Sequence, residues 1–316
     1  MLAERAQAGA DKEIIQAAAL TVLAQQQAQG VVAIADISNT GFIQELAPDF
    51  PGHLICFREY LGLRSDELES SLQHLETAEE AQNCTAHAPY STHLHLLQTL
   101  KTRAKRLGHI FSIHVAESLA EHDMVSQGTG ELRLFLEQRG FWDDSFQPTG
   151  AYSKGAVSYL QQHGLLDSNT LCVHALHVTD QEIDLLAETK AKVCLCPSSN
   201  RYLGVGTAPV EKYLNKGILP ALGTDSLTSN PELSIWQEMA LLAKEHPTVK
   251  STDILRMATL GGAMALGLDE QFGSLEAGKK SEILTVHLAY SMPNALSLSN
   301  YLVSQDIKSN SLYSLA

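Results

Sequence analysis

Two apolar stretches of the chain end in side chains that could bind a metal ion or move a proton. The segment 110–117 is apolar up to His114 and carries Glu117 three residues later, and the segment 218–226 carries Asp225 near its end. An imidazole nitrogen and a carboxylate oxygen together suit Zn²⁺ or another borderline metal. We therefore expect His114 and Asp225 to be metal ligands, while Glu117 stays free to transfer protons.

Each of these side chains also has a purely structural explanation. A lone histidine in an apolar strand is more often a hydrogen-bonded core residue, and Asp225 could cap the following helix. Glu117 shifts the balance toward function, because a buried carboxylate is costly without a partner. A catalytic zinc takes at least three protein ligands and an open position for water. His174, also at the end of an apolar run, could be a further ligand or could hydrogen-bond an oxyanion.

Other histidines and cysteines give weaker indications. His87 lies in a loop before a proline, where it could touch a substrate or bond to the backbone. His93 and His95 form a literal His-x-His pair, but they open a helical stretch in which residues two apart face different ways, so we expect no metal there. Cys194 and Cys196 should point to opposite faces of a strand and make a poor zinc clip.

The elements that would position these residues are seven apolar runs separated by stretches of helical periodicity. The runs cover 30–38, 53–63, 81–91, 110–117, 169–179, 191–200 and 218–226. Strands that alternate with helices predict a parallel sheet. The polar candidates gather at the C-terminal ends of the runs, where barrel and doubly wound enzymes place their chemistry. We further expect a helix over 11–29, a helix after Asp253 and a strand over 282–288.

Composition narrows the class of protein. The 316 residues carry 36 acids and 22 bases, a formal net charge of −14, and no basic stripe offsets it. We therefore expect neither a nucleic-acid partner nor an anionic membrane surface. The odd count of five cysteines, all in apolar runs, predicts free thiols in a reducing compartment. Without an apparent membrane span or signal peptide, the prediction is a cytoplasmic protein, with homo-oligomer formation left open.

Several motifs resemble one enzyme family. They are HAPYS at 87–91, HVAES at 114–118, a strand-end histidine at 174, CPSSNRYLGVG at 194–204 and LGTDSLTSN at 222–230. The series resembles the amidohydrolase superfamily, in its branch of cytosine, guanine and adenosyl-nucleoside deaminases and triazine chlorohydrolases. The resemblance implies an α/β fold, a TIM-type (β/α)8 barrel lacking its first strand, over residues 1–270. Residues 271–316 would be the C-terminal part of a small β-sandwich domain.

The same resemblance implies roles for individual residues. His114 and Asp225 would bind one divalent metal ion, expected to be Zn²⁺. Glu117 would shuttle a proton from the metal-bound water to the leaving nitrogen, and His174 would polarise the attacked centre or steady the hydroxide. The substrate would be a small heterocyclic molecule, and the residues expected to contact it are His87, Ser199, Asn200 and Arg201.

The chain also departs from the family. The family's first strand ends in a His-x-His that provides two metal ligands, and no such strand precedes the helix at 11–29. We therefore expect an incomplete ligand set, a missing N-terminal segment and little activity in the chain as given. The predicted function is metal-dependent hydrolysis of non-peptide C–N bonds, as in deamination of a purine-like or related heterocycle. The alternative is a non-catalytic amidohydrolase-like binding or assembly protein.

Overall fold

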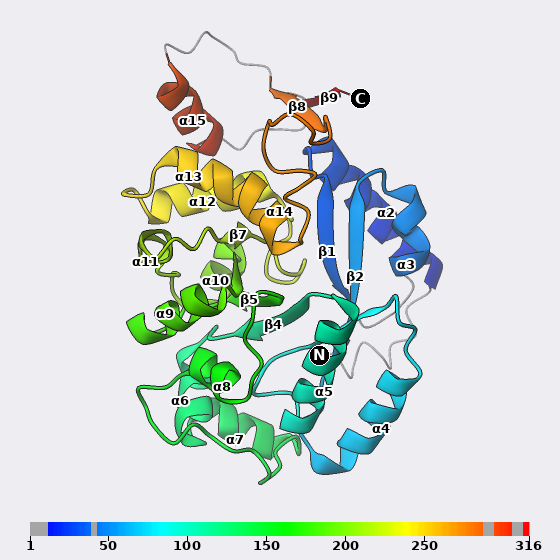
Figure 1. Cartoon of the computed structure of the whole chain (residues 1–316), viewed down its shortest axis with the longest axis vertical. Coiled ribbons are helices and arrows are strands. Elements are labelled where there is room, and N and C mark those ends of the chain that lie inside the picture. The colour runs from blue at the N-terminus through cyan, green and yellow to red at the C-terminus, as the bar shows by residue number, and fades with distance from the viewer. Residues whose placement is uncertain (1–11, 39–42, 287–293, 305–311, 316) are drawn as a thin grey trace.

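The computed structural model describes residues 12–38, 43–286, 294–304 and 312–315 (Figure 1). All seven predicted runs contain a strand in the structure, which confirms the expected order of alternating strands and helices. The strands are β1 (Ala33–Ser38), β2 (His53–Tyr60), β3 (Asn83–Ala86), β4 (Phe111–Val115), β5 (Thr170–His174), β6 (Lys192–Leu195) and β7 (Ala221–Leu222).

The seven strands are parallel and pair in chain order. One sheet has the order β1-β2-β3, with Ala33 opposite His53, and the other has the order β4-β5-β6-β7, with Phe111 opposite Thr170. The two sheets adjoin, since the backbone N–H of His114 donates to the carbonyl of His87 over 2.9 Å. The parallel α/β arrangement is thus confirmed. Closure into a barrel is not seen in the strand pairing of the described residues, which ends at β1 and at β7.

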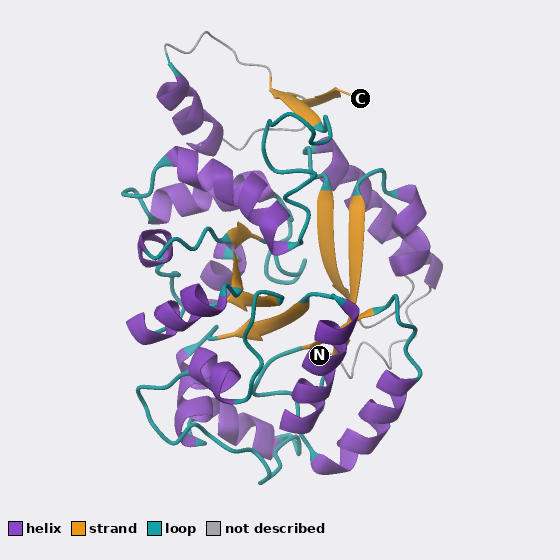
Figure 2. Ribbon diagram, in the orientation of Figure 1, coloured by secondary structure: helices purple, strands orange, loops and turns teal. Residues whose placement is uncertain are grey.

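Most helices lie on the outside of these strands, as Figure 2 shows. Before β4 they are α2 (Lys12–Ala28), α3 (Ile43–Leu46), α4 (Ser65–Glu76) and α5 (Leu94–Leu107). Between β4 and β6 they are α6 (Leu119–Gln127), α7 (Glu131–Gln138), α8 (Ala156–Gln162) and α9 (Asp180–Thr189). Later helices are α10 (Pro197–Leu203), α11 (Val210–Asn215), α12 (Ile235–Glu245), α13 (Ser251–Arg256), α14 (Gly262–Ala265) and α15 (Ala295–Ser304). No helix in the described ranges is long and apolar enough to cross a membrane.

The N-terminal helix α2 matches the predicted segment and contacts the chain that follows β7. The side-chain amide of Gln26 donates to the carbonyl of Leu233 over 2.6 Å. The indole N–H of Trp236 donates to the carbonyl of Gln29 over 3.0 Å. Because hydrogen bonds are directional, these two fix the orientation of α2 as well as its distance from the chain after β7. They hold the first and the last of the parallel βα units next to each other.

The core lies between the strands and the helices that cover them. Phe111 and Ile113 in β4 are fully buried, and α5 presents Leu96, Leu97 and Leu100 to the same apolar cluster. Leucines at these spacings share one face of a helix, so α5 buries a continuous stripe. Burying a leucine side chain contributes about 1.5–3 kcal/mol. This packing makes the sheet a rigid base for the residues at its C-terminal edge.

The C-terminal part contains a feature that the pattern did not predict. Strand β8 (Ile283–Val286) lies within the expected strand 282–288, whose last two residues fall outside the described ranges, and it pairs antiparallel with β9 (Leu312–Leu315). Residues 295–304, for which the pattern predicts no element, form helix α15. Its start is capped by Asn294, whose side chain accepts from the N–H of Ser297. Ser299 and Val303 are buried on its inner face, so packing against the rest of the protein stabilises the helix.

Candidate active site

The turn after β4 carries His114 and Glu117. Strand β4 ends at Val115, and Ala116 adopts a left-handed conformation with φ of 54°, which bends the chain sharply before Glu117. Non-glycine residues seldom adopt this conformation, and it costs roughly 1 kcal/mol or more. Burial, followed by the neighbouring imidazoles of His174 and His87, lowers the pKa of His114. His114 is therefore a neutral imidazole with a lone pair available at neutral pH.

His174, at the end of β5, is the most buried member of the cluster, with 1% of its surface exposed. Its Nδ1 atom lies 2.9 Å from Oδ1 of Asn200, and its Nε2 atom lies 3.1 Å from Nδ1 of His114. The same Nε2 atom lies 3.7 Å from Oε1 of Glu117. His174 thus stands between the predicted ligand and the predicted proton carrier. Its φ of 72° is a second left-handed bend at a strand end.

Asp225 follows β7 and faces the same cluster. Its Oδ2 atom accepts hydrogen bonds from the hydroxyls of Ser199, over 2.5 Å, and Ser229, over 3.1 Å. Desolvation alone would raise the pKa of Asp225, but the Ser199 hydroxyl and the imidazoles of His174 and His114 outweigh it, and the pKa is lowered. The carboxylate is therefore anionic at neutral pH, while the residue stays open to solvent.

His87 borders the cluster from the loop after β3. Its ring centroid lies 5.3 Å from that of His114 and 5.8 Å from that of Tyr90. Its Nδ1 atom is 2.6 Å from the hydroxyl of Ser91, so the ring is held within its own loop. Tyr90 is not among the residues that the sequence predicts for the site. Burial and then the nearby carboxylates, Glu121 first, raise the pKa of its phenol well above the usual range.

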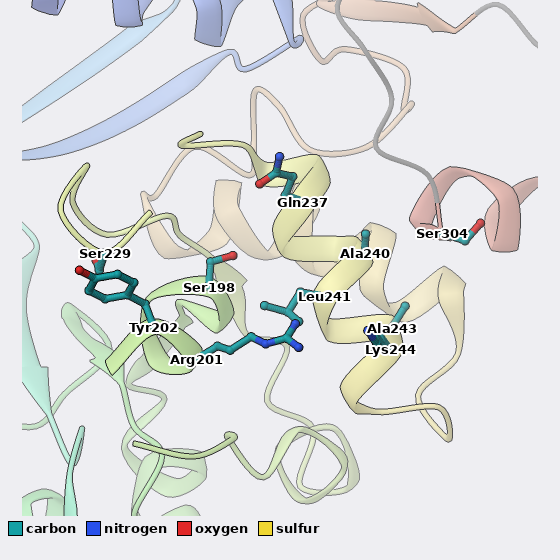
Figure 3. A pocket seen from close by; sticks show the side chains of 10 residues that line it. All are labelled: Ser198, Arg201, Tyr202, Ser229, Gln237, Ala240, Leu241, Ala243, Lys244 and Ser304. Atoms are coloured by element: carbon teal, nitrogen blue, oxygen red, sulfur yellow. The ribbon is translucent and has the colours of Figure 1, made fainter. Parts of the chain in front are cut away.

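The three consecutive residues Ser199, Asn200 and Arg201 in α10 do not all reach the cluster. Ser199 and Asn200 are buried and contact Asp225 and His174, respectively. Arg201 is exposed and is directed toward α12 (Figure 3). There it lines an open pocket of about 720 Å³, which Ser229 beside Asp225 also borders. The structure therefore brings two of the three predicted substrate residues to the site and leaves Arg201 outside it.

The remaining sequence predictions have clear outcomes. His93 is the N-cap of α5, where its Nδ1 atom accepts from the N–H of His95, so the His-x-His pair caps a helix as expected. The prediction that Cys194 and Cys196 point to opposite faces was wrong. Strand β6 ends at Leu195, so Cys196 already belongs to the turn, and a Cβ placed on Gly223 would meet both sulfur atoms, at 2.8 and 3.4 Å. The five cysteines are free thiols.

The donor set can be compared with the needs of a zinc ion. Zinc in proteins takes nitrogen, sulfur and oxygen ligands, and catalytic sites use three of them or more. His114 and Asp225 have the right chemistry and point to one region. Among the residues that the structure describes, however, no group of three or more His, Cys, Asp or Glu side chains is arranged to hold a metal ion. The described residues alone do not complete a zinc site.

Comparison with known proteins places the chain in a family. The pattern of the amidohydrolase family matches residues 10–307, so the chain belongs to that family. The chain is 34% identical to a 5-methylthioadenosine/S-adenosylhomocysteine deaminase of Caldanaerobacter subterraneus subsp. tengcongensis over 209 residues. That match covers 64% of this chain and 43% of the relative, so the chain spans less than half of the relative's length.

Two further similarities cover more of the chain. An aminodeoxyfutalosine deaminase of Nitratiruptor sp. is 26% identical over 298 residues, which are 90% of this chain and 70% of the relative. The crystal structure of an adenosine deaminase from Xanthomonas campestris with bound zinc superposes with a TM-score of 0.69 at 22% identity. It covers 93% of this chain and 66% of the other. The family match confirms the predicted family, and the superposition agrees with its α/β fold.

Proposed function

We propose that the protein is a hydrolytic deaminase of a purine nucleoside, of the 5′-thioadenosine or aminofutalosine type. The observation that carries the proposal is the convergence of His114, Glu117, His174 and Asp225 from three strand ends, with Glu117 Oε1 at 3.7 Å from His174 Nε2. A proton acceptor next to a buried imidazole is an arrangement suited to general acid–base catalysis. The deaminases among the similar proteins support this choice of substrate class.

In the proposed reaction, the oxygen of water bonds to the ring carbon that carries the amino group, and the C–N bond of that group then breaks. Glu117 accepts a proton from the attacking water and delivers it to the departing nitrogen, which leaves as ammonia. With Nδ1 held by Asn200, the imidazolium form of His174 donates a hydrogen bond from Nε2 to the oxygen as negative charge develops there. His87, beside the cluster, contacts the heterocycle. Ser199 and Asn200 orient Asp225 and His174, and contact between Arg201 and the substrate stays a prediction.

We also propose that His114 and Asp225 are two of the ligands of one divalent metal ion, expected to be zinc. The support is the chemistry of the two side chains and the zinc in the Xanthomonas campestris structure. A metal in this position would supply Lewis-acid activation of the attacking water. Because the described residues provide no group of three donors, we expect the chain itself to bind zinc weakly and to have little activity.

The fold-level part of the proposal concerns the strands. We propose that β1 to β7 are strands two to eight of a (β/α)8 barrel over residues 1–270, and that residues 271–316 belong to a small β-sandwich. The hydrogen bonds from Gln26 to Leu233 and from Trp236 to Gln29 support a curved arrangement, because they link the segments next to β1 and β7, the outer strands of the two sheets. The free cysteines support a cytoplasmic protein.

Ammonia release by the purified chain with added zinc would test the function. The panel would contain 5′-methylthioadenosine, S-adenosylhomocysteine, adenosine, aminodeoxyfutalosine and a chlorotriazine. We expect slow ammonia release from one or more of the nucleosides and no release of chloride, the group that hydrolysis would displace, from the triazine. If no nucleoside is deaminated and none binds in calorimetry, the proposal is contradicted. Tight binding of a nucleoside that is never deaminated would favour the non-catalytic alternative.

A further inference from the structure

Glu121 is a buried glutamate that is not among the predicted site residues, and it contacts the backbone of Glu117. Glu121 is in the first turn of α6 and has 0% of its surface exposed. In the part of the chain that the structure describes, it forms no ion pair with a lysine or an arginine. A carboxyl group in such a place needs hydrogen-bond partners in compensation. The identity of those partners shows what the residue does.

The donors are the backbone N–H groups of the turn that carries Glu117. The N–H of Ala116 donates to Oε1 of Glu121 over 2.9 Å, and the N–H of Glu117 donates to Oε2 over 2.8 Å. One carboxylate thus clamps two successive peptide groups at the left-handed bend of Ala116. Because hydrogen bonds are directional, two of them to a single carboxyl group hold both peptide groups in a fixed orientation. The two bonds offset the strain of the bend.

This contact is different from ordinary helix capping. Ser118 and Glu121 have the spacing of a capping box, in which the glutamate would bond to the N–H of the N-cap residue. The Ser118 hydroxyl does accept from the N–H of Glu121, over 3.1 Å. The Glu121 carboxylate, however, reaches one and two residues further back, to Glu117 and Ala116. Its bonds therefore go to the turn of the candidate site.

The peptide held by Glu121 also contacts the loop that follows β5. The carbonyl of Ala116 accepts hydrogen bonds from the N–H groups of Leu176 and His177, both over 2.9 Å. That loop begins at His174, the imidazole opposite Glu117. One peptide group therefore connects the two strand ends that carry the proposed proton carrier and its neighbour. A shift of Ala116 would change the distance between them.

We propose that Glu121 is a positioning residue that sets the place of Glu117 relative to His174. This inference rests on the proposed function for its catalytic consequence, but its structural content is independent of it. Glu182 in α9 offers a matched control. It is equally buried and occupies the same position in its helix, yet it forms the ordinary capping box with Thr179 and also accepts from the N–H of Ser158.

The test compares Glu121→Gln with Glu182→Gln by amide hydrogen exchange and by kinetics. The amide introduced by Glu121→Gln would turn an N–H₂ group toward a backbone N–H, so one of the two clamping bonds is lost. We expect the amides of Ala116 and Glu117 to exchange at least tenfold faster than in the parent. The value of kcat should fall roughly a hundredfold with little change in KM, as misplacement by about 1 Å can cause. Glu182→Gln should destabilise the protein without either effect.

Unchanged exchange at Ala116 and Glu117 in Glu121→Gln would overturn the inference, as would equal effects of the two variants. If Glu121→Gln does not fold, the amide exchange of Ala116 and Glu117 in the parent protein tests the inference instead. The two amides lie outside any strand, so strong protection supports the clamp and rapid exchange contradicts it. A chain without deaminase activity would count against the proposed function, while the exchange result would still judge the role of Glu121.

Discussion

Oδ1 of Asn200 lies 2.9 Å from Nδ1 of His174, so the amide fixes one nitrogen of the imidazole and leaves Nε2 turned toward His114 and Glu117. Both partners are almost completely buried. We predict that Asn200→Ala lowers the free energy of unfolding by about 1–3 kcal/mol, because the ring nitrogen loses its partner. Urea unfolding would measure the change. Arg201→Ala, at the next and exposed position, should have little effect, and equal losses would contradict the assignment.

Stability should depend on pH through Glu121 and Glu238. Burial raises the pKa of Glu121 to about 8 and that of Glu238 to about 7, from an ordinary value of 4.5. Between the ordinary pKa of 4.5 and the raised pKa values, the folded protein keeps protons that the unfolded chain has released. The free energy of unfolding therefore falls as the pH rises. Each unit of raised pKa corresponds to about 1.4 kcal/mol. Neighbouring carboxylates also raise both pKa values. They are Glu117 and Glu182 beside Glu121, and Glu245 beside Glu238.

Chemical unfolding at a series of pH values from about 5 to about 9, a range that spans these pKa values, would measure this slope. The double variant Glu121→Gln and Glu238→Gln should show a flatter profile than the parent. An increase of stability with pH in the parent, or an identical slope in the variant, would show that these two carboxyl groups do not titrate as described.

The third prediction concerns the ion pair between Lys101, which is buried, and Asp167. Nζ of Lys101 lies 2.6 Å from Oδ1 of Asp167 and 2.7 Å from Oγ1 of Thr170, and Lys101 is 4% exposed. Lys101→Met should lower the free energy of unfolding by roughly 2–3 kcal/mol, because Asp167 and Thr170 keep no cation. Denaturant unfolding checks this value. Lys212→Met breaks an exposed pair with Asp180 and should change stability little.

A fourth prediction concerns Gly223, just before the turn of Asp225. A Cβ at Gly223 would lie 2.8 Å from the sulfur of Cys194 and 3.4 Å from that of Cys196. We expect Gly223→Ala to displace this turn and to lower the melting temperature by several degrees, as about 1–3 kcal/mol of overpacking would. Gly262→Ala in α14, where no atom lies within 4 Å, should leave the melting temperature unchanged or raise it. A harmless Gly223→Ala would contradict the tight packing.

The sequence predicted the parallel strands and the main residues of the site for a simple physical reason. Apolar, β-branched runs are buried on both faces in a parallel sheet, and their C-terminal ends meet at one edge. His114, His174 and Asp225 end separate runs, so their convergence followed from the pattern once the order of strands was assumed. The structure brings them together as expected.

Other features depend on backbone geometry that no pattern reveals. The rotation of the seven-residue helix α10 about its axis decides which of its side chains face the site. Ser199 and Asn200 face it, whereas Arg201 is exposed on the outer side of the helix. The cysteine pair converges because β6 ends one residue before Cys196. The reach of Glu121 past its own N-cap depends on the left-handed bend at Ala116. Its position one helical turn after Glu117 was the only available signal.

The most direct test of the central claim is a comparison of the parent with Glu117→Gln. The substitution would keep the size of the side chain, but its amide could not accept the proton of the attacking water. Both proteins would be assayed for ammonia release from the best nucleoside of the panel, with binding of that nucleoside measured in parallel. We predict that binding changes by less than about threefold while turnover falls at least about a hundredfold. Turnover that survives unchanged in Glu117→Gln would contradict the assignment of Glu117 as the proton carrier.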